Sequence, residues 1–174
     1  DLTATYWIWK NAKEEVVGTN HYRRFWDEEY MSNIELDDRT IYISEPKVNF
    51  NVNAITQFID CHGKYGIEVL EKLIKNPDYP LRKEIFQSLY EVNFISGCNM
   101  FFCHKILYNK VCDILFSMLF PIFFESVEEI GQMDYFQRRF VAYLSERIIT
   151  AIMLNSNYYF GNNINVVSVP YKMI

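Results

Sequence analysis

The chain has 174 residues, of which 50% are hydrophobic and 17% aromatic, and its formal net charge is −5. This length suits one domain, spanning residues 1–174, with a sizeable core. Because the charge is negative and no block of Lys or Arg stands out, we expect no nucleic-acid partner. The aromatic side chains are expected mainly to fill the core, although Tyr and Phe also stack on sugars.

The first predicted elements are a helix and a strand. Residues 2–11 fit a helix that Asp1 or Thr3 would cap. Residues 15–22 fit a buried central strand, because the segment contains β-branched residues and Gly18 allows a close approach. Open α/β sheets bind ligands beyond the carboxyl ends of their strands, so the polar residues that end this strand are candidates for a site.

The rest of the chain alternates predicted strands with helices. Pro121 is expected to kink the longest helix, and Gly97 is expected at a point of close approach in a strand. Helices between strands imply an α/β fold in which helix outweighs strand. The strands are predicted at residues 40–43, 94–103 and 165–169, and the helices at 52–61, 66–75, 80–89, 105–130 and 137–155.

The most apolar stretch covers residues 106–124. Lys110, Asp113 and Pro121 interrupt it, which disfavours a membrane-spanning helix. An amphipathic helix with a very apolar face fits better, and such a face usually packs into the core. The alternative is that this face touches a membrane surface or a partner.

Cysteine spacing favours free thiols. No Cys-x-x-Cys pair occurs and the first residues do not form a signal peptide, so we expect reduced thiols in a bacterial cytosol. A zinc site is a weaker alternative, because the spacing of the donors matches no common zinc pattern. The donors of that alternative are Cys61, His62, Cys98, Cys103 and His104, and the fourth cysteine is Cys112.

Two short motifs are specific: Tyr-Trp-x-Trp-Lys-Asn at residues 6–11 and His-Tyr-Arg-Arg at residues 21–24. In these motifs, and in the order and rough spacing of the segments around them, the chain resembles a bacterial family known as domain of unknown function four-four-two-two. Members of that family occur in capsular and exopolysaccharide gene clusters. The further segments that carry the resemblance are His62 and residues 97–101, 119–121 and 139–147.

The resemblance implies a GT-A-like nucleotide-diphospho-sugar transferase fold, with a mixed sheet flanked by helices. The family pattern has a strand and a loop before its first helix, so we expect this sequence to lack that first strand and to be the larger, C-terminal part of the family domain. The implied function is transfer of a sugar from a nucleotide-sugar donor to a lipid-linked oligosaccharide. The implied location is the cytoplasm, with at most a peripheral contact at the inner face of the cytoplasmic membrane.

Two other functional classes stay open. The first is a non-catalytic carbohydrate-binding or assembly module that keeps the same fold. The second is a hydrolase, which would need two carboxylates flanking a cleft, and no such pair is evident in the sequence.

Sugar transfer leaves negative charge on a diphosphate, which a metal ion, Arg or Lys side chains, or helix N-termini must stabilise. The adjacent acids Asp37 and Asp38 are a weak candidate for holding Mn²⁺ or Mg²⁺, so the sequence assigns no metal ligand and no definite cofactor. The candidates for contacting the diphosphate or the donor sugar are instead His21, Arg23 and Arg24.

An extended backbone would place His21 and Arg23 on one side of the strand and Arg24 on the other. On that basis His21 and Arg23 are expected to face the diphosphate. The structural alternative is that the two arginines pair with acids nearby, namely Asp27 or Glu28.

Glu146 is the predicted catalytic residue, because a carboxylate facing a cleft can deprotonate an acceptor hydroxyl in an inverting transfer. Its neighbour Arg147 is predicted to contact the sugar or the acceptor. The alternative for this pair is a salt bridge of the helix, and Asp134 and Glu91 are weaker candidates for the base.

Two further residues are predicted to contact the sugar or the acceptor. Asn99 follows a glycine beside aromatic residues, so its amide could bond a sugar hydroxyl or satisfy the core. Trp7 could stack on a sugar, although core packing is favoured both for it and for Trp9. His62 is expected to be an ordinary helix histidine rather than a catalyst.

Overall fold

A computed structural model describes residues 2–46, 50–79 and 83–173. Within these ranges, the helices outweigh the strands, as the sequence predicts. The elements in chain order are α1 (Leu2–Asn11), β1 (Val16–Gly18), β2 (Arg24–Trp26), α2 (Glu28–Ser32), β3 (Thr40–Ser44), α3 (Ala54–His62), α4 (Tyr65–Ile74), α5 (Lys83–Glu91), the 3₁₀-helix η1 (Gly97–Asn99), β4 (Phe101–His104), α6 (Lys105–Glu125), α7 (Val127–Gln132), the 3₁₀-helix η2 (Gln137–Arg139), α8 (Phe140–Leu154), α9 (Ser156–Phe160), β5 (Asn165–Val169) and β6 (Tyr171–Met173).

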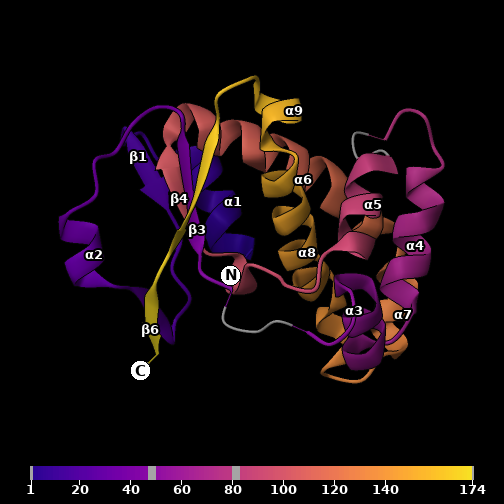
Figure 1. The fold of residues 1–174 in the computed structure, drawn as a ribbon. Helices are drawn as coiled ribbons and strands as arrows, with labels where there is room; N and C mark the ends of the chain where they lie inside the picture. The colour runs from indigo at the N-terminus through magenta and orange to yellow at the C-terminus, as the bar shows by residue number, and fades with distance from the viewer. Residues whose placement is uncertain (1, 47–49, 80–82, 174) are drawn as a thin grey trace.

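The described part of the chain is an α/β fold built on a mixed four-stranded sheet in the order β1-β4-β3-β5. β4 is antiparallel to both β1 and β3, whereas β3 and β5 are parallel. The carboxyl ends of β1, β3 and β5 therefore lie at the same edge of the sheet. A separate antiparallel pair joins β2 to β6. Figure 1 shows α1, α6 and α8 beside the sheet and α3, α4, α5 and α7 farther to the right.

The two faces of the sheet enter different clusters. In β3, Ile41 and Ile43 belong to the main core together with residues of α6 and α8, whereas Tyr42 faces the other way. On that second face Tyr42 stacks on Phe102 at 4.7 Å, and Trp26 packs against the edge of Phe102. This alternation is the two-residue period of a strand, and it places the large helical core on one face only.

The strand predicted at residues 15–22 is shorter than expected and lies at the edge of the sheet, not at its centre. β1 covers Val16–Gly18, and a single further bond from the Thr19 amide to the Phe101 carbonyl (3.0 Å) extends the pairing. The chain then turns, because the Arg24 amide donates to the His21 carbonyl at 3.1 Å. His21–Arg24 is therefore a turn between two sheets rather than the end of an extended strand.

The segment predicted as one strand at residues 94–103 is divided. Cys98 and Asn99 have positive φ angles of 67° and 53°, which no strand accommodates, so η1 precedes the short strand β4. Gly97 is not at a point of close approach, since a Cβ there would have no heavy atom within 4 Å. Gly18 does lie at such a point, as predicted, directly against β4.

The helix boundaries also differ in places. Pro121 lies inside α6, and the break comes later, at Ser126, between α6 and α7. The helix predicted at residues 137–155 begins as η2 and continues as α8. The helix predicted at residues 80–89 is described only from Lys83 onward. Asp1, one of the two expected caps of α1, lies outside the described residues, and Thr3 lies within the helix.

The apolar helix α6 meets the length and hydropathy expected of a membrane span, with half of its most apolar window buried inside the fold. Its core-facing residues include Leu115, Leu119 and Ile122. Its exposed aromatic residues are Phe120, Phe123 and Phe124. A helix that packs in a core meets the same criterion as a membrane span, so these properties do not by themselves place α6 in a bilayer.

Candidate functional site

A cavity of about 380 Å³ lies where the carboxyl ends of β3 and β5 meet the helices. Ser44, the last residue of β3, bonds there to Ser96 and to the Gly97 carbonyl (both 2.9 Å), and Tyr171 follows β5. The position agrees with the rule that such sheets bind ligands at this edge. The residues that line the cavity are Arg24, Phe50, Gln57, Cys61, His62, Ile95, Gly97, Cys98, Phe136, Tyr143, Glu146, Arg147 and Tyr171.

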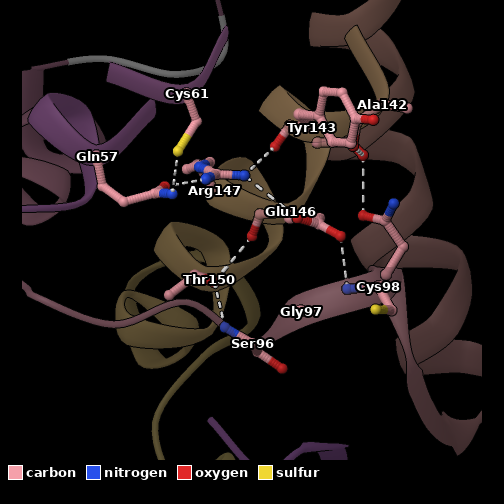
Figure 2. Close-up of polar contacts among 12 residues, drawn as sticks. Gln57, Cys61, Ser96, Gly97, Cys98, Ala142, Tyr143, Glu146, Arg147 and Thr150 are labelled. Atoms are coloured by element: carbon pink, nitrogen blue, oxygen red, sulfur yellow. Dashed lines mark hydrogen bonds and ion pairs between the residues drawn. The ribbon is translucent and has the colours of Figure 1, made fainter. Parts of the chain in front are cut away.

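Helix α8 supplies one wall of this cavity. Tyr143, Glu146, Arg147 and Thr150 are spaced i, i+3, i+4 and i+7, so they share one face of the helix. Figure 2 shows this face against η1 and α3. The Thr150 hydroxyl accepts a bond from the Ser96 amide (3.0 Å), which fixes the chain before η1 against α8.

Glu146 points from α8 to η1. Its Oε1 accepts a hydrogen bond of 2.6 Å from the Cys98 amide, and its Oε2 lies 3.2 Å from a guanidinium nitrogen of Arg147 (Figure 2). Burial raises the pKa of Glu146, and the neighbouring charge of Arg147 opposes part of that shift. The carboxylate therefore holds the left-handed Cys98 in place and has a raised pKa, which is the direction that favours a general base.

Arg147 is the largest of the fully buried side chains, at 2% exposure. Its guanidinium donates to the Tyr143 carbonyl at 2.8 Å and to Oε1 of Gln57 (Figure 2). The guanidinium also lies over the ring of Phe58. Burial lowers the pKa of Arg147. The side chain still stays charged at neutral pH, because the guanidinium group is a very strong base. The site therefore holds a fixed, buried positive charge.

Three buried nitrogens around this cavity have no hydrogen-bond partner among the described residues. They are Nε of Arg24, Nδ1 of His62 and Nε of Arg147. Arg24 reaches the cavity from β2, where its Nη1 contacts Sγ of Cys98. Further buried polar atoms of this kind lie elsewhere in the described residues, so their presence alone marks no site. At this cavity the two guanidinium nitrogens can donate to a ligand, and Nδ1 of His62 can donate or accept according to its tautomer.

His62 is neutral in this setting. Burial, reinforced by the charge of Arg147, lowers the pKa of His62 to about 4. The ring stacks on Tyr143 at 4.0 Å and on Phe136 at 5.2 Å. The sequence indicated an ordinary helix histidine, whereas the structure places His62 in the lining of the cavity.

A pH-dependent loss of stability is expected from His62. Because its pKa is lower in the folded chain than in the unfolded one, its contribution is complete above about pH 6.5 and is lost as the pH falls toward 4. Replacing His62 by Phe keeps the stacking and removes the titration. Urea unfolding at pH 7 and pH 4.5 should show the His62→Phe variant losing roughly 2 kcal/mol less stability than the unmodified chain. If both chains lost the same stability between pH 7 and pH 4.5, the lowered pKa of His62 would not be a source of the loss.

The turn at His21–Arg24 directs the three residues predicted to contact the diphosphate or the donor sugar to different places. Arg24 lines the cavity, whereas Arg23 is exposed and its guanidinium lies 4.8 Å from the ring centre of Tyr22. The buried His21 accepts from the Arg23 amide at 3.2 Å, and its pKa is lowered by burial and by the two arginines. The predicted alternation of these side chains was wrong, because it assumed an extended backbone.

The acids proposed as partners of these arginines are engaged elsewhere or exposed. Asp27 pairs with Lys172 at 2.8 Å and caps α2 by accepting from the Tyr30 amide. Glu28 is exposed in the first turn of α2.

Asn99 and Trp7 occupy positions away from the cavity lining. Asn99 is 3% exposed, and its Oδ1 accepts from the Ser145 hydroxyl at 2.8 Å, which fits the structural alternative for this residue. Trp7 is 61% exposed, so the expected core packing was wrong for it. Trp9 does pack against the core and stacks on Phe116 at 5.4 Å. The sugar contacts predicted for Asn99 and Trp7 stay predictions.

The weaker acidic candidates accept hydrogen bonds from residues close to them in the sequence. Asp134 accepts from the Gln137 amide at 2.7 Å, and Glu91 accepts from Gln87 at 3.0 Å on the exposed side of α5. Asp37 accepts from the Arg39 amide and from the Thr40 hydroxyl, one bond to each carboxylate oxygen.

Within the described residues, no group of three or more His, Cys, Asp or Glu side chains is placed to hold a metal ion. Asp37 and Asp38 are not in the cavity lining, so they do not fit a metal at this site. Cys103 is buried in β4 and His104 lies 3.4 Å from Glu15, so the five donors of the zinc hypothesis do not form one cluster.

Sequence reasoning missed several residues of the cavity. Gln57 and Phe136 gave no signal, because their roles depend on how α3 and the segment before η2 pack on α8. Tyr143 could have been found, since it lies three residues before Glu146 on the same helix face.

Comparisons with known proteins agree with this fold. The sequence pattern of a family described as "Domain of unknown function (DUF4422)" matches residues 1–157. The fold is similar to a solved structure described as the apo form of the bifunctional glycosyltransferase WbbM, with a TM-score of 0.61 and 18% sequence identity. The match covers 99% of this chain and 36% of that chain, so this chain spans about a third of its length. At this identity the likeness shows the fold alone. No curated protein matches the chain.

Proposed function

The chain belongs to the DUF4422 family, and on that premise we propose that it is a GT-A-like glycosyltransferase domain. Its donor is a nucleotide sugar, and its acceptor is a lipid-linked oligosaccharide of capsular or exopolysaccharide biosynthesis. Support for the reaction class comes from the fold shared with a bifunctional glycosyltransferase. A lipid-linked acceptor implies work at the inner face of the cytoplasmic membrane, and the exposed Phe120, Phe123 and Phe124 suit a peripheral contact there.

The observation that carries this proposal is the set of unpartnered nitrogens around one cavity. Nε of Arg24, Nδ1 of His62 and Nε of Arg147 all lack partners, and the two guanidinium groups carry positive charge. A diphosphate offers many acceptor oxygens and negative charge, so it can satisfy such a set. We assign Arg24 and Arg147 to the diphosphate, with His62 as a neutral contact.

In the proposed transfer, Glu146 and the two arginines have separate roles. The acceptor hydroxyl oxygen attacks the anomeric carbon, and its proton passes to a carboxylate oxygen of Glu146. The bond from the anomeric carbon to the diphosphate oxygen breaks, and its electron pair leaves with the nucleoside diphosphate. The positive charges of Arg24 and Arg147 stabilise that leaving group as it forms.

A non-catalytic carbohydrate-binding or assembly module is the second candidate. One observation favours it: both carboxylate oxygens of Glu146 already have partners, the Cys98 amide and Arg147. A carboxylate with these partners holds η1 against α8, a role that needs no catalysis. Each oxygen retains a further acceptor position, so the arrangement also permits catalysis.

Nucleotide binding tests the leading proposal. Thermal unfolding is measured with UDP or GDP, each with and without Mn²⁺, on the unmodified chain and on Arg24→Gln and Arg23→Gln. We expect a nucleotide to raise the melting temperature, and Arg24→Gln to weaken its binding by about tenfold or more, as hydrogen bonds to charged groups do.

Arg23→Gln is the matched control. Arg23 is exposed next to Arg24 in the sequence, so its replacement should leave the affinity unchanged. If neither nucleotide stabilises the chain under any of these conditions, the transferase proposal loses its support. If Arg23→Gln weakens binding and Arg24→Gln does not, the assignment of the diphosphate contact is wrong.

A further inference from the structure

One side of the cavity is an aromatic wall made of His62, Phe136 and Tyr143. The three ring centres lie within 5.3 Å of one another, with His62 stacked on Tyr143 at 4.0 Å. His62 and Tyr143 are partly buried, whereas Phe136 is 48% exposed. The wall is therefore rigid at its base and offers Phe136 as its free ring.

The rest of the cavity lining is mixed, with the apolar side chains of Phe50 and Ile95 beside four charged or amide side chains. Glu146 and Arg147 project from α8, Gln57 from α3 and Arg24 from β2. A pyranose ring has one face of C–H groups, which packs on an aromatic ring, and an edge of hydroxyls, which bond to carboxylates, amides and guanidinium groups. The cavity offers both kinds of surface, and its volume of about 380 Å³ lies in the usual range for small-molecule sites.

A second hollow lies next to His62. It measures about 200 Å³ and shares His62 with the first cavity. Its lining includes the polar residues Lys64 and Gln137 together with Met133 and Phe140. The two hollows therefore have His62 in common.

We propose that Phe136 is the stacking platform for a pyranose unit of the acceptor, held so that a hydroxyl of that unit points to Glu146. His62 and Tyr143 are positioning residues that fix the Phe136 ring. Calling this sugar the acceptor rests on the proposed function. The sugar subsite itself does not require that the chain transfers a sugar.

Saturation-transfer NMR tests the subsite directly. The probes are methyl glycosides of glucose, galactose, mannose and N-acetylglucosamine, added without any nucleotide to the full chain. At least one glycoside should receive saturation on its ring C–H protons. Phe136→Ala should weaken its binding roughly fivefold, because one aromatic contact is lost, and Phe136→Tyr should restore it.

Phe123→Ala is the matched control, since Phe123 is the same residue type at 44% exposure but lies on α6. Phe123→Ala should leave the saturation transfer to the glycoside unchanged. The inference would be overturned if none of the four glycosides received saturation. It would also be overturned if Phe136→Ala bound the glycoside as well as the unmodified chain does. If the chain binds a sugar through Phe136 but binds no nucleotide, the subsite is supported and the transferase proposal is not. That result would favour the carbohydrate-binding module.

Discussion

Replacing Arg147 by Met is expected to lower the free energy of unfolding by roughly 3–5 kcal/mol, the usual result of removing one partner from a buried ion pair. Met nearly matches the length of the arginine stem, so little packing is lost. What is lost is the charge opposite Glu146 and the bonds to Gln57 and to the Tyr143 carbonyl. Urea unfolding at neutral pH measures the difference.

The double variant Glu146→Gln/Arg147→Met separates the charge from the packing. If the unpaired carboxylate is the main source of the loss, adding Glu146→Gln should recover part of the stability. Arg39→Met is the control, because Arg39 is 67% exposed and lies 3.9 Å from Asp38. Surface pairs contribute less than about 1 kcal/mol, so a comparable loss in Arg39→Met would contradict the importance given to burial.

Gly18→Ala is expected to cost about 3 kcal/mol, the upper part of the usual range for overpacking. A Cβ at this position would lie 2.2 Å from Cβ of Phe102 and 2.9 Å from the Phe101 carbonyl oxygen. Both belong to the neighbouring strand β4, which is itself held by β3, so neither can move without breaking the sheet.

Gly131→Ala is the matched control for that variant. Gly131 is in helix α7 and has open space where a Cβ would be added. Its replacement should leave stability unchanged or raise it by up to about 1 kcal/mol, because Ala favours a helix. Equal effects of the two variants would show that the close contact of β1 with β4 is not what makes Gly18 necessary.

Much of the fold could be predicted from local patterns. The helix at residues 2–11 and the strand at residues 165–169 have the predicted bounds, and β3 is longer than predicted by one residue. Each depends on periodicity, β-branching and a nearby Pro or cap, all of which neighbouring residues determine. The missed elements β2, α2, α9 and β6 are five residues or shorter, and segments of that length carry little periodic signal.

The partners of a strand cannot be determined by its own residues. Val16–Gly18 has the composition of a buried central strand, yet it lies at the edge, because β5 from the far end of the chain takes the position beside β3. The positive φ angles of Cys98 and Asn99 are also a tertiary result, since the Cys98 amide is held by Glu146 from another helix.

The amino-acid sequence by itself determined the α/β class and the family resemblance, and it marked the His21–Arg24 and Glu146–Arg147 segments as candidates for a site. Only the tertiary structure decided that Arg24 rather than Arg23 lines the cavity, that His62 is part of it, and that Asn99 bonds within the core. The physical reason is that side-chain direction follows from the turn at His21 and from the packing of α3 and α8 around η1. Those contacts join residues up to about ninety positions apart, as between Gln57 and Arg147, and no local pattern records them.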